Sequence, residues 1–128
     1  MSKQSPLEEL FSDSGPVDLD QLVMVLKPFV RIHSDSKEIY LTDQGNKCNI
    51  KNKMLIYFLA KKLLKLEEFI STESVSAKEI ADKLNLKKGS VDATFKTLRE
   101  SGFIMGSGKE YNIPNYKISD INTVLGAK

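Results

Sequence analysis

The side chains best suited to chemistry lie in the segment KKGSVDATFKTLRE, residues 87–100, which combines basic, hydroxyl and small residues. Lysine and arginine attract phosphate groups, serine and threonine can hydrogen-bond to base edges, and small residues let a backbone approach its partner closely. On a helix of about 100° per residue, side chains four apart lie on the same side, so Gly89, Ala93 and Thr97 form a ridge of small side chains. The candidate binding residues in this segment are Lys87, Lys88, Gly89, Ser90, Ala93, Thr94, Lys96, Thr97 and Arg99.

The same segment carries an apolar stripe at Val91, Phe95 and Leu98, which is the i, i+4, i+7 spacing of an amphipathic helix. Asp92 and Glu100 lie among the basic residues and would bring negative charge close to phosphate groups. A second hypothesis therefore stays open, in which the outer side of this helix is merely solvated or packs on another protein.

Catalytic and metal-binding chemistry has few candidates in this sequence. A single cysteine, Cys48, excludes an intramolecular disulfide and leaves too few thiolates for a structural zinc site. Spacing alone permits a nucleophilic pair with the single histidine, His33, but neither residue lies in a recognisable catalytic setting. A glycine-rich phosphate loop is also missing from the sequence. We expect no enzymatic activity, no cofactor and no bound metal.

Composition limits the class of protein. The chain has 128 residues, of which 41% are hydrophobic and 28% are charged, as expected for one compact globular domain or a small domain with an extension. Its apolar runs are shorter than the roughly 18 residues of a membrane span, and the N-terminus has no apolar signal core. These features predict a cytoplasmic protein, nucleoid-associated if prokaryotic, that does not bind a membrane.

Charge is distributed unevenly along the chain. Residues 1–50 carry five Lys or Arg against eight acids, a net charge of −3. Residues 51–118 carry thirteen Lys or Arg against eight acids, a net charge of +5. A local excess of basic residues is the usual electrostatic signature of a polyanion partner, although lysine-rich helices are often only solvated.

The elements before the basic segment follow from hydrophobic periodicity. Asp18 is a candidate N-cap for a helix that Pro28 should end. The stretch FVRIHSDSKEIYLT, residues 29–42, contains two alternating apolar and polar runs, which predicts a β-hairpin with one buried face. We expect DQGNKCN, residues 43–49, to be a loop.

A long helix should follow over IKNKMLIYFLAKKLLKLEEFI, residues 50–70. It is apolar over most of its circumference, so it must be covered on two sides. The basic C-terminal half of the chain is the expected cover on one side. On the other side, two hypotheses stay open: the N-terminal helix of the same chain, or a second subunit in a homodimer.

Capping signals define the elements around the candidate residues. Ser76 and Glu79 form an S-x-x-E capping box that should begin a helix ending near Leu84. A second helix should run from Lys87 or Lys88 to Glu100 and stop at Ser101-Gly102. Residues 103–105 and 111–113 are predicted strands, joined through residues 106–110.

A long helix followed by helix, tight turn, helix and hairpin resembles the winged helix-turn-helix family over residues 51–118. The motif VSAKEIADKLNLKKGSVDATFKTLRESGFI carries the resemblance, with Ala81 midway in its first helix and LRESGFI leading into the hairpin. It departs from the family at the start of the third helix, where Lys87-Lys88-Gly89 replaces the usual serine or threonine cap. The resemblance implies a mainly α fold with small β-hairpins (α+β).

The resemblance also implies a function, the binding of double-stranded DNA. Helix 87–100 would enter the major groove, and the wing at 105–112 would touch the adjacent backbone through Ser107 and Lys109. Proteins of this kind usually act as dimeric transcriptional regulators. The alternative is a winged-helix interaction module or scaffold subunit. In both hypotheses residues 1–50 form an N-terminal extension and residues 119–128 a C-terminal tail.

Overall fold

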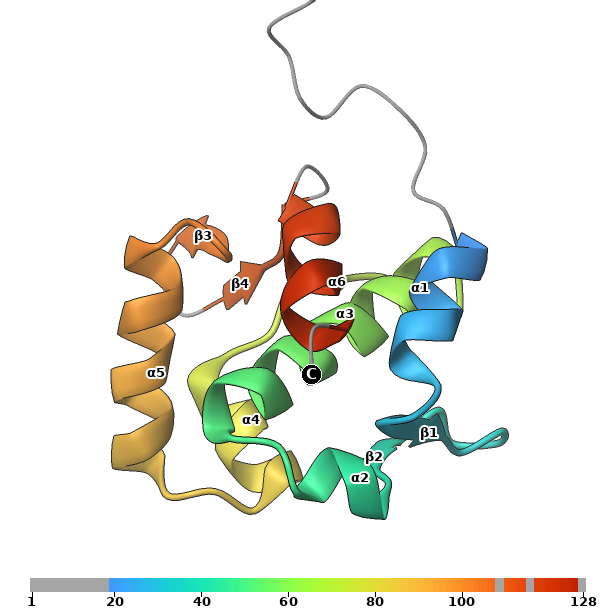
Figure 1. Cartoon of the computed structure of the whole chain (residues 1–128), viewed down its shortest axis with the longest axis horizontal. Helices are drawn as coiled ribbons and strands as arrows, with labels where there is room; N and C mark the ends of the chain where they lie inside the picture. The colour runs from blue at the N-terminus through green and yellow to red at the C-terminus, as the bar shows by residue number, and fades with distance from the viewer. Residues whose placement is uncertain (1–18, 108–109, 115–116, 127–128) are drawn as a thin grey trace, which may run out of the picture.

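A computed structural model describes residues 19–107, 110–114 and 117–126. These residues form helices and two small antiparallel hairpins, an α+β arrangement as predicted (Figure 1). The elements in chain order are α1 (Leu19–Leu26), β1 (Val30–Ile32), β2 (Ile39–Leu41), α2 (Asp43–Asn46), α3 (Ile50–Leu66), α4 (Ala77–Leu84), α5 (Lys88–Glu100), β3 (Met105–Ser107), β4 (Glu110–Asn112) and α6 (Ile118–Gly126).

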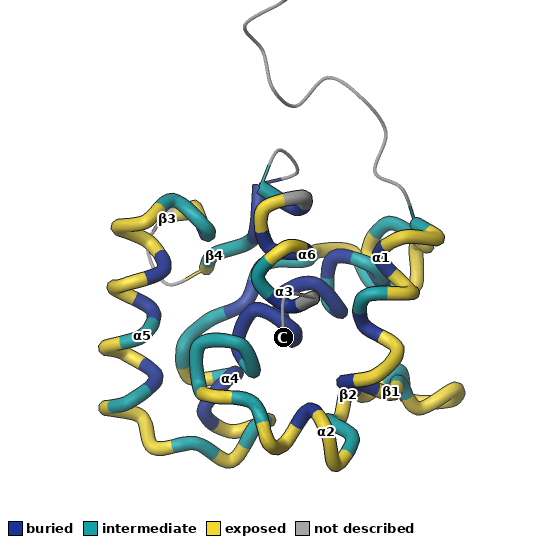
Figure 2. The backbone as a smooth tube through the Cα atoms, in the orientation of Figure 1, coloured by how far each residue is buried: buried dark blue, intermediate teal, exposed yellow. Residues whose placement is uncertain are grey.

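Helix α3 is the centre of the packing. All residues from 54 to 60 are buried, so no side of this part of the helix faces solvent (Figure 2). Helices α4 and α5 contact α3, as expected for the basic C-terminal half, and α1 of the same chain packs on it as well. The predicted cover on two sides is therefore confirmed, and α1 supplies part of it within one chain.

The N-terminal hairpin forms as predicted. Val30 pairs with Leu41 and Ile32 with Ile39; Val30 and Ile39 are buried, Ile32 and Leu41 are half-buried, and Arg31 and Tyr40 between them are exposed. The proposed N-cap of the preceding helix, Asp18, lies outside the described residues.

The prediction of a loop over residues 43–49 is wrong in its first half, where α2 forms. Thr42 caps this helix, because its hydroxyl accepts a hydrogen bond from the backbone N–H of Gly45 at 3.1 Å. Gly45 is buried, and a Cβ at this position would collide with the carbonyl oxygen of Phe29. The glycine suggested a loop in the sequence, but its role here is to let α2 approach the backbone of Phe29, between α1 and β1, closely.

Helices α4 and α5 have the predicted bounds and caps. The Ser76 hydroxyl accepts from the N–H of Glu79 at 3.1 Å, and Asn85, at a φ of 56°, ends α4 in the left-handed conformation. Lys87 is the N-cap of α5 and makes no side-chain capping bond, in agreement with the unusual sequence at this position. Gly102, at a φ of 85°, ends α5.

The second hairpin is displaced from its predicted position. The strands are β3 and β4, so Phe103 and Ile104 precede the first strand and residues 106–107 belong to it. The N–H of Phe103 bonds to the carbonyl of Leu98 at 3.0 Å, which is the closing bond of the α5 C-cap. Because this bond holds Phe103 against α5, the strand can begin only afterwards.

The segment 119–128, expected to be a tail, is largely helical. Helix α6 buries Ile118, Ile121 and Leu125 in the same core as α3 and contacts α1. Its side chains at i, i+3 and i+7 form an apolar stripe that finds its partner only after the chain has folded. No helix within the described ranges is long and apolar enough to cross a membrane.

Candidate functional site

A groove of about 650 Å³ lies where the start of α4, one side of α5 and strand β4 meet. Three separate elements form its walls, and α5 stands at one end of the molecule (Figure 1). The lining residues are Ser76, Ala77, Lys78, Lys88, Asp92, Phe95, Lys96, Arg99, Glu110 and Tyr111.

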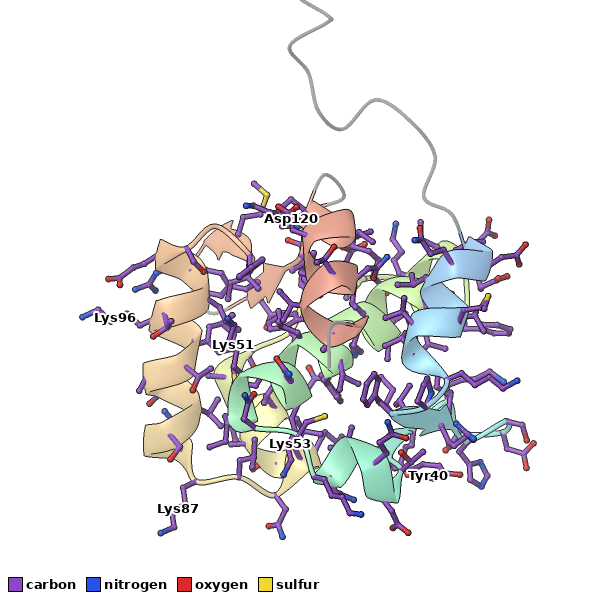
Figure 3. All side chains as sticks on the ribbon, in the orientation of Figure 1. Tyr40, Lys51, Lys53, Lys87, Lys96 and Asp120 are labelled. Carbon is purple, nitrogen blue, oxygen red and sulfur yellow. The ribbon has the colours of Figure 1, made fainter. Side chains whose placement is uncertain are left out.

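The groove is predominantly basic. Lys78, Lys88, Lys96 and Arg99 line it together with two carboxylates, those of Asp92 and Glu110. The Lys88 ammonium lies 3.0 Å from an Asp92 carboxylate oxygen, so part of its charge is neutralised. Lys78 and Lys96 form no ion pair with a carboxylate of the described residues, and Lys96 extends away from α5 (Figure 3). These two lysines are the strongest candidates for binding an anion.

Contacts between α3 and α4 fix the first wall of the groove. The Tyr57 hydroxyl donates to Glu79 at 2.6 Å, and the Lys61 ammonium lies 3.0 Å from the same carboxylate oxygen. Burial, followed by the hydrogen bond to Glu79, raises the pKa of Tyr57 far above its usual value, so the hydroxyl stays a donor. The first turn of α4, which carries Ser76 and Lys78, is thereby held against α3.

The wall formed by β4 is held by two contacts. Val75 and Tyr111 exchange both backbone hydrogen bonds, at 2.7 and 2.9 Å, in an isolated bridge before α4. The buried ammonium of Lys62 pairs with Glu73, which also accepts from the Asn112 amide at 2.9 Å. Strand β4 is therefore fixed to α3 and to the segment that precedes α4.

Two aromatic rings form the floor. Phe95 of α5 meets Tyr111 edge to face, with ring centroids 5.2 Å apart, and lies 5.8 Å from the ring of Phe58 in α3. The Arg99 guanidinium donates to the Tyr111 hydroxyl at 3.4 Å. This contact orients a cation of α5 toward the strand.

The structure distributes the predicted binding residues over three places. Lys88, Lys96 and Arg99 line the groove. A second set is exposed on the outer side or at the N-terminus of α5 and consists of Lys87, Gly89, Ala93 and Thr97. Figure 3 shows the Lys87 side chain pointing outward. Ser90 and Thr94 are half-buried and do not line the groove, so they are poorer candidates than their sequence positions indicate.

The predicted wing residues are described only in part. The backbone of Ser107 belongs to β3 and pairs with Glu110, whereas Lys109 lies outside the described residues.

Five residues of the groove outside α5 were not predicted to bind: Ser76, Ala77, Lys78, Glu110 and Tyr111. Ser76 was identified only as a cap, and the other four belong to elements whose relation to α5 depends on tertiary packing. A possible signal was the β-branched Val75 between two helices, because an extended residue at that position can pair with the second hairpin.

The single cysteine and the single histidine both make local contacts. The described residues contain no group of three or more His, Cys, Asp or Glu that could hold a metal ion. Cys48 is half-buried, and its Sγ lies 3.6 Å from the carbonyl oxygen of Gln44. The Nδ1 atom of His33 accepts from the backbone N–H groups of Asp35 and Ser36 at 3.3 and 3.4 Å, which is a local turn.

No protein-family model, curated protein or solved structure matches this chain. The function of the groove must therefore be inferred from its own residues and contacts.

Proposed function

We propose that this protein is a sequence-specific double-stranded DNA-binding protein of the winged helix-turn-helix kind, a small transcriptional regulator that inserts α5 into the major groove. The succession of α3, α4, α5, β3 and β4, with Val75 bridged to Tyr111, supports this interpretation. In this arrangement the start of α4 and the hairpin flank α5, where they would meet the DNA backbone on both sides.

The observation that carries the proposal is the basic groove. Its four cations come from α4 and α5, and two of them, Lys78 and Lys96, have no described carboxylate partner. The adjacent outer side of α5 carries Gly89, Ala93 and Thr97, all exposed. Small side chains let a helix enter a major groove about 12 Å wide, while the flanking cations neutralise phosphates.

The second candidate function is a protein-interaction module or scaffold subunit. Asp92 and Glu110 favour it, because both carboxylates line the same groove and Asp92 engages Lys88. A groove with mixed charges suits a polar protein surface as well as a phosphate backbone. The two functions differ in their dependence on salt and on unpaired lysines.

The deciding experiment titrates the protein against a fluorescent generic DNA duplex at several salt concentrations. DNA binding predicts that log K falls with log salt by about 0.9 per neutralised phosphate. In a Lys88→Ala/Lys96→Ala variant we expect that slope to decrease by about 1 to 2 and the affinity to fall about tenfold or more. A Lys65→Ala/Lys83→Ala variant removes the same charge outside the groove and should bind like the unmodified protein.

Either of two results would reject DNA binding in the groove: no duplex binding at low salt, or equal losses in both double variants. The interaction module would then be the better hypothesis, and a pull-down would be the next step.

A homodimer remains a prediction. Residues 54–60 of α3 are buried within one chain, so a dimer would have to use other surfaces, such as the exposed side chain of Met24. Light scattering that gives a monomer at tens of micromolar would reject it.

A further inference from the structure

Two adjoining apolar hollows lie among α1, β1 and the C-terminal part of α3, at the end of the molecule away from α5 (Figure 1). Their volumes are about 350 and 270 Å³, and they share the side chains of Val23, Ile32 and Leu63. Because they share these walls, the hollows form one continuous surface.

Large apolar side chains are exposed on this surface. Val23 is 44% exposed and Phe69, which lines the second hollow, is 58% exposed. Exposed apolar groups that gather around a depression, rather than being scattered, are typical of a docking site.

The rim of the hollows is basic. Lys27, Arg31 and Lys37 line it, and none of the three forms an ion pair with a carboxylate in the described part of the chain. Arg31 donates to the carbonyl oxygens of Lys27 and Val30, and the Lys37 ammonium lies 4.6 Å from the centroid of the Phe69 ring. The only carboxylate among the described lining residues is that of Glu67, and His33 also lines the second hollow.

These charges decide between possible occupants. A second copy docking by two-fold symmetry would bring its own Lys27, Arg31 and Lys37 toward the same three cations, and like charges opposite each other disfavour such an interface. An acidic segment would place carboxylates on the rim while its apolar side chains fill the hollows.

We propose that this surface binds an acidic amphipathic segment of a partner protein, with neighbouring large apolar side chains in the two hollows and carboxylates on Lys27, Arg31 and Lys37. The surface and α5 lie at opposite ends of the molecule, so a partner bound here would leave the basic groove accessible. The inference does not depend on the ligand of that groove.

The test uses the full chain and a fluorescein-labelled amphipathic peptide of fourteen residues, with leucine at positions i, i+3, i+4 and i+7, glutamate at four of the other positions and alanine at the rest. Fluorescence anisotropy should show saturable binding, and a peptide with lysine in place of glutamate should bind about tenfold more weakly or not at all. Phe69→Ala and Arg31→Glu should each lower the affinity for the acidic peptide about fivefold or more.

Two matched controls separate this surface from others. Met24 is 74% exposed but does not line these hollows, so Met24→Ala should leave peptide binding unchanged. Lys96→Glu makes the same charge change as Arg31→Glu but at the α5 end of the molecule, and it should also leave peptide binding unchanged. Lys96→Glu should affect only duplex binding, so failures of the two proposals are distinguishable.

Four results would overturn the inference. The first is that the lysine peptide binds as well as the acidic one. The second is that Phe69→Ala and Arg31→Glu bind the acidic peptide normally. The third is that a Leu10→Asp/Phe11→Asp variant binds the peptide several-fold more tightly, which would identify the chain's own acidic stretch PLEELFSD as the occupant. The fourth is that sedimentation detects a dimer that Val23→Asp dissociates, which would identify a second copy.

Discussion

Replacing Glu73 by glutamine should destabilise the protein far more than a surface substitution of the same kind. Glu73 pairs with Lys62, whose side chain is only 3% exposed, whereas the Glu73 side chain is 15% exposed. Glutamine keeps the size and a hydrogen-bond acceptor but removes the negative charge. The ammonium of Lys62 would then stay in the core without this carboxylate.

The unequal burial of the two partners sets the expected magnitudes. Removing the partner of a buried charge typically costs about 3–5 kcal/mol, and Glu73→Gln should fall near the lower end because the acceptor remains. Lys62→Met removes the more deeply buried charge. The Glu73 carboxylate that remains has some solvent access and keeps its hydrogen bond from Asn112, so we expect a loss of about 1–2 kcal/mol in the free energy of unfolding. Lys62→Met/Glu73→Leu should be less destabilised than Glu73→Gln alone.

Urea denaturation at neutral pH, followed by circular dichroism, measures these differences. For an m-value of about 1.5 kcal/mol per molar, a loss of about 3 kcal/mol lowers the midpoint by about 2 M. Glu38→Gln is the matched control, because the Lys83–Glu38 pair is 48% and 66% exposed and should contribute at most about 1 kcal/mol. Equal midpoint shifts for Glu73→Gln and Glu38→Gln, or a larger loss in Lys62→Met than in Glu73→Gln, would refute the reasoning.

Three further predictions concern the groove and the helix ends. Asp92→Asn removes the carboxylate 3.0 Å from Lys88 and should raise duplex affinity about threefold, since a unit charge about 7 Å from a phosphate is worth about 0.6 kcal/mol in water; weaker binding would contradict this in the same salt titration. Ser76→Ala removes the bond to the α4 N-terminus and should cost about 1 kcal/mol in thermal unfolding, and an unchanged melting temperature would count against the cap. Gly45→Ala should destabilise the protein because its Cβ meets the Phe29 carbonyl. The Cβ of Gly89→Ala meets nothing within 4 Å, so this change should stabilise the protein by up to about 1 kcal/mol. The urea midpoints should therefore shift in opposite directions, and shifts of the same sign would refute the comparison.

Local signals predicted much of the C-terminal half. The stripe of Val91, Phe95 and Leu98 is buried as expected, and the Ser76 cap and Gly102 stop lie where they were predicted, although the Glu79 carboxylate of the box bonds to Tyr57 and Lys61. These features depend on side chains within one or two helical turns, so the sequence contains all the partners. The N-terminal hairpin was predictable for the same reason, because its alternation and its turn are both local.

Other elements depended on contacts between distant parts of the chain. Helix α2 contains a glycine because the close approach of Phe29 to Gly45, not the intrinsic preference of glycine, governs that position. The shift of β3 follows from the cap bond between Phe103 and Leu98, which competes with strand formation. Helix α6 has an apolar stripe in the sequence, but only the folded chain supplies the surface that it covers.

The sequence by itself determined which side of α5 is buried, because its apolar stripe has the helical period, and where α4 and α5 begin and end, because hydrogen bonds between near neighbours cap them. Only the tertiary structure decided that Lys78 and Tyr111 join Lys96 in one groove, and that Val23, Ile32 and Leu63 line a second surface at the other end. Periodicity assigns each residue to a side of its own helix or strand. The elements that meet at a groove depend on how those sides pack, and that choice is made by side chains far apart in the chain.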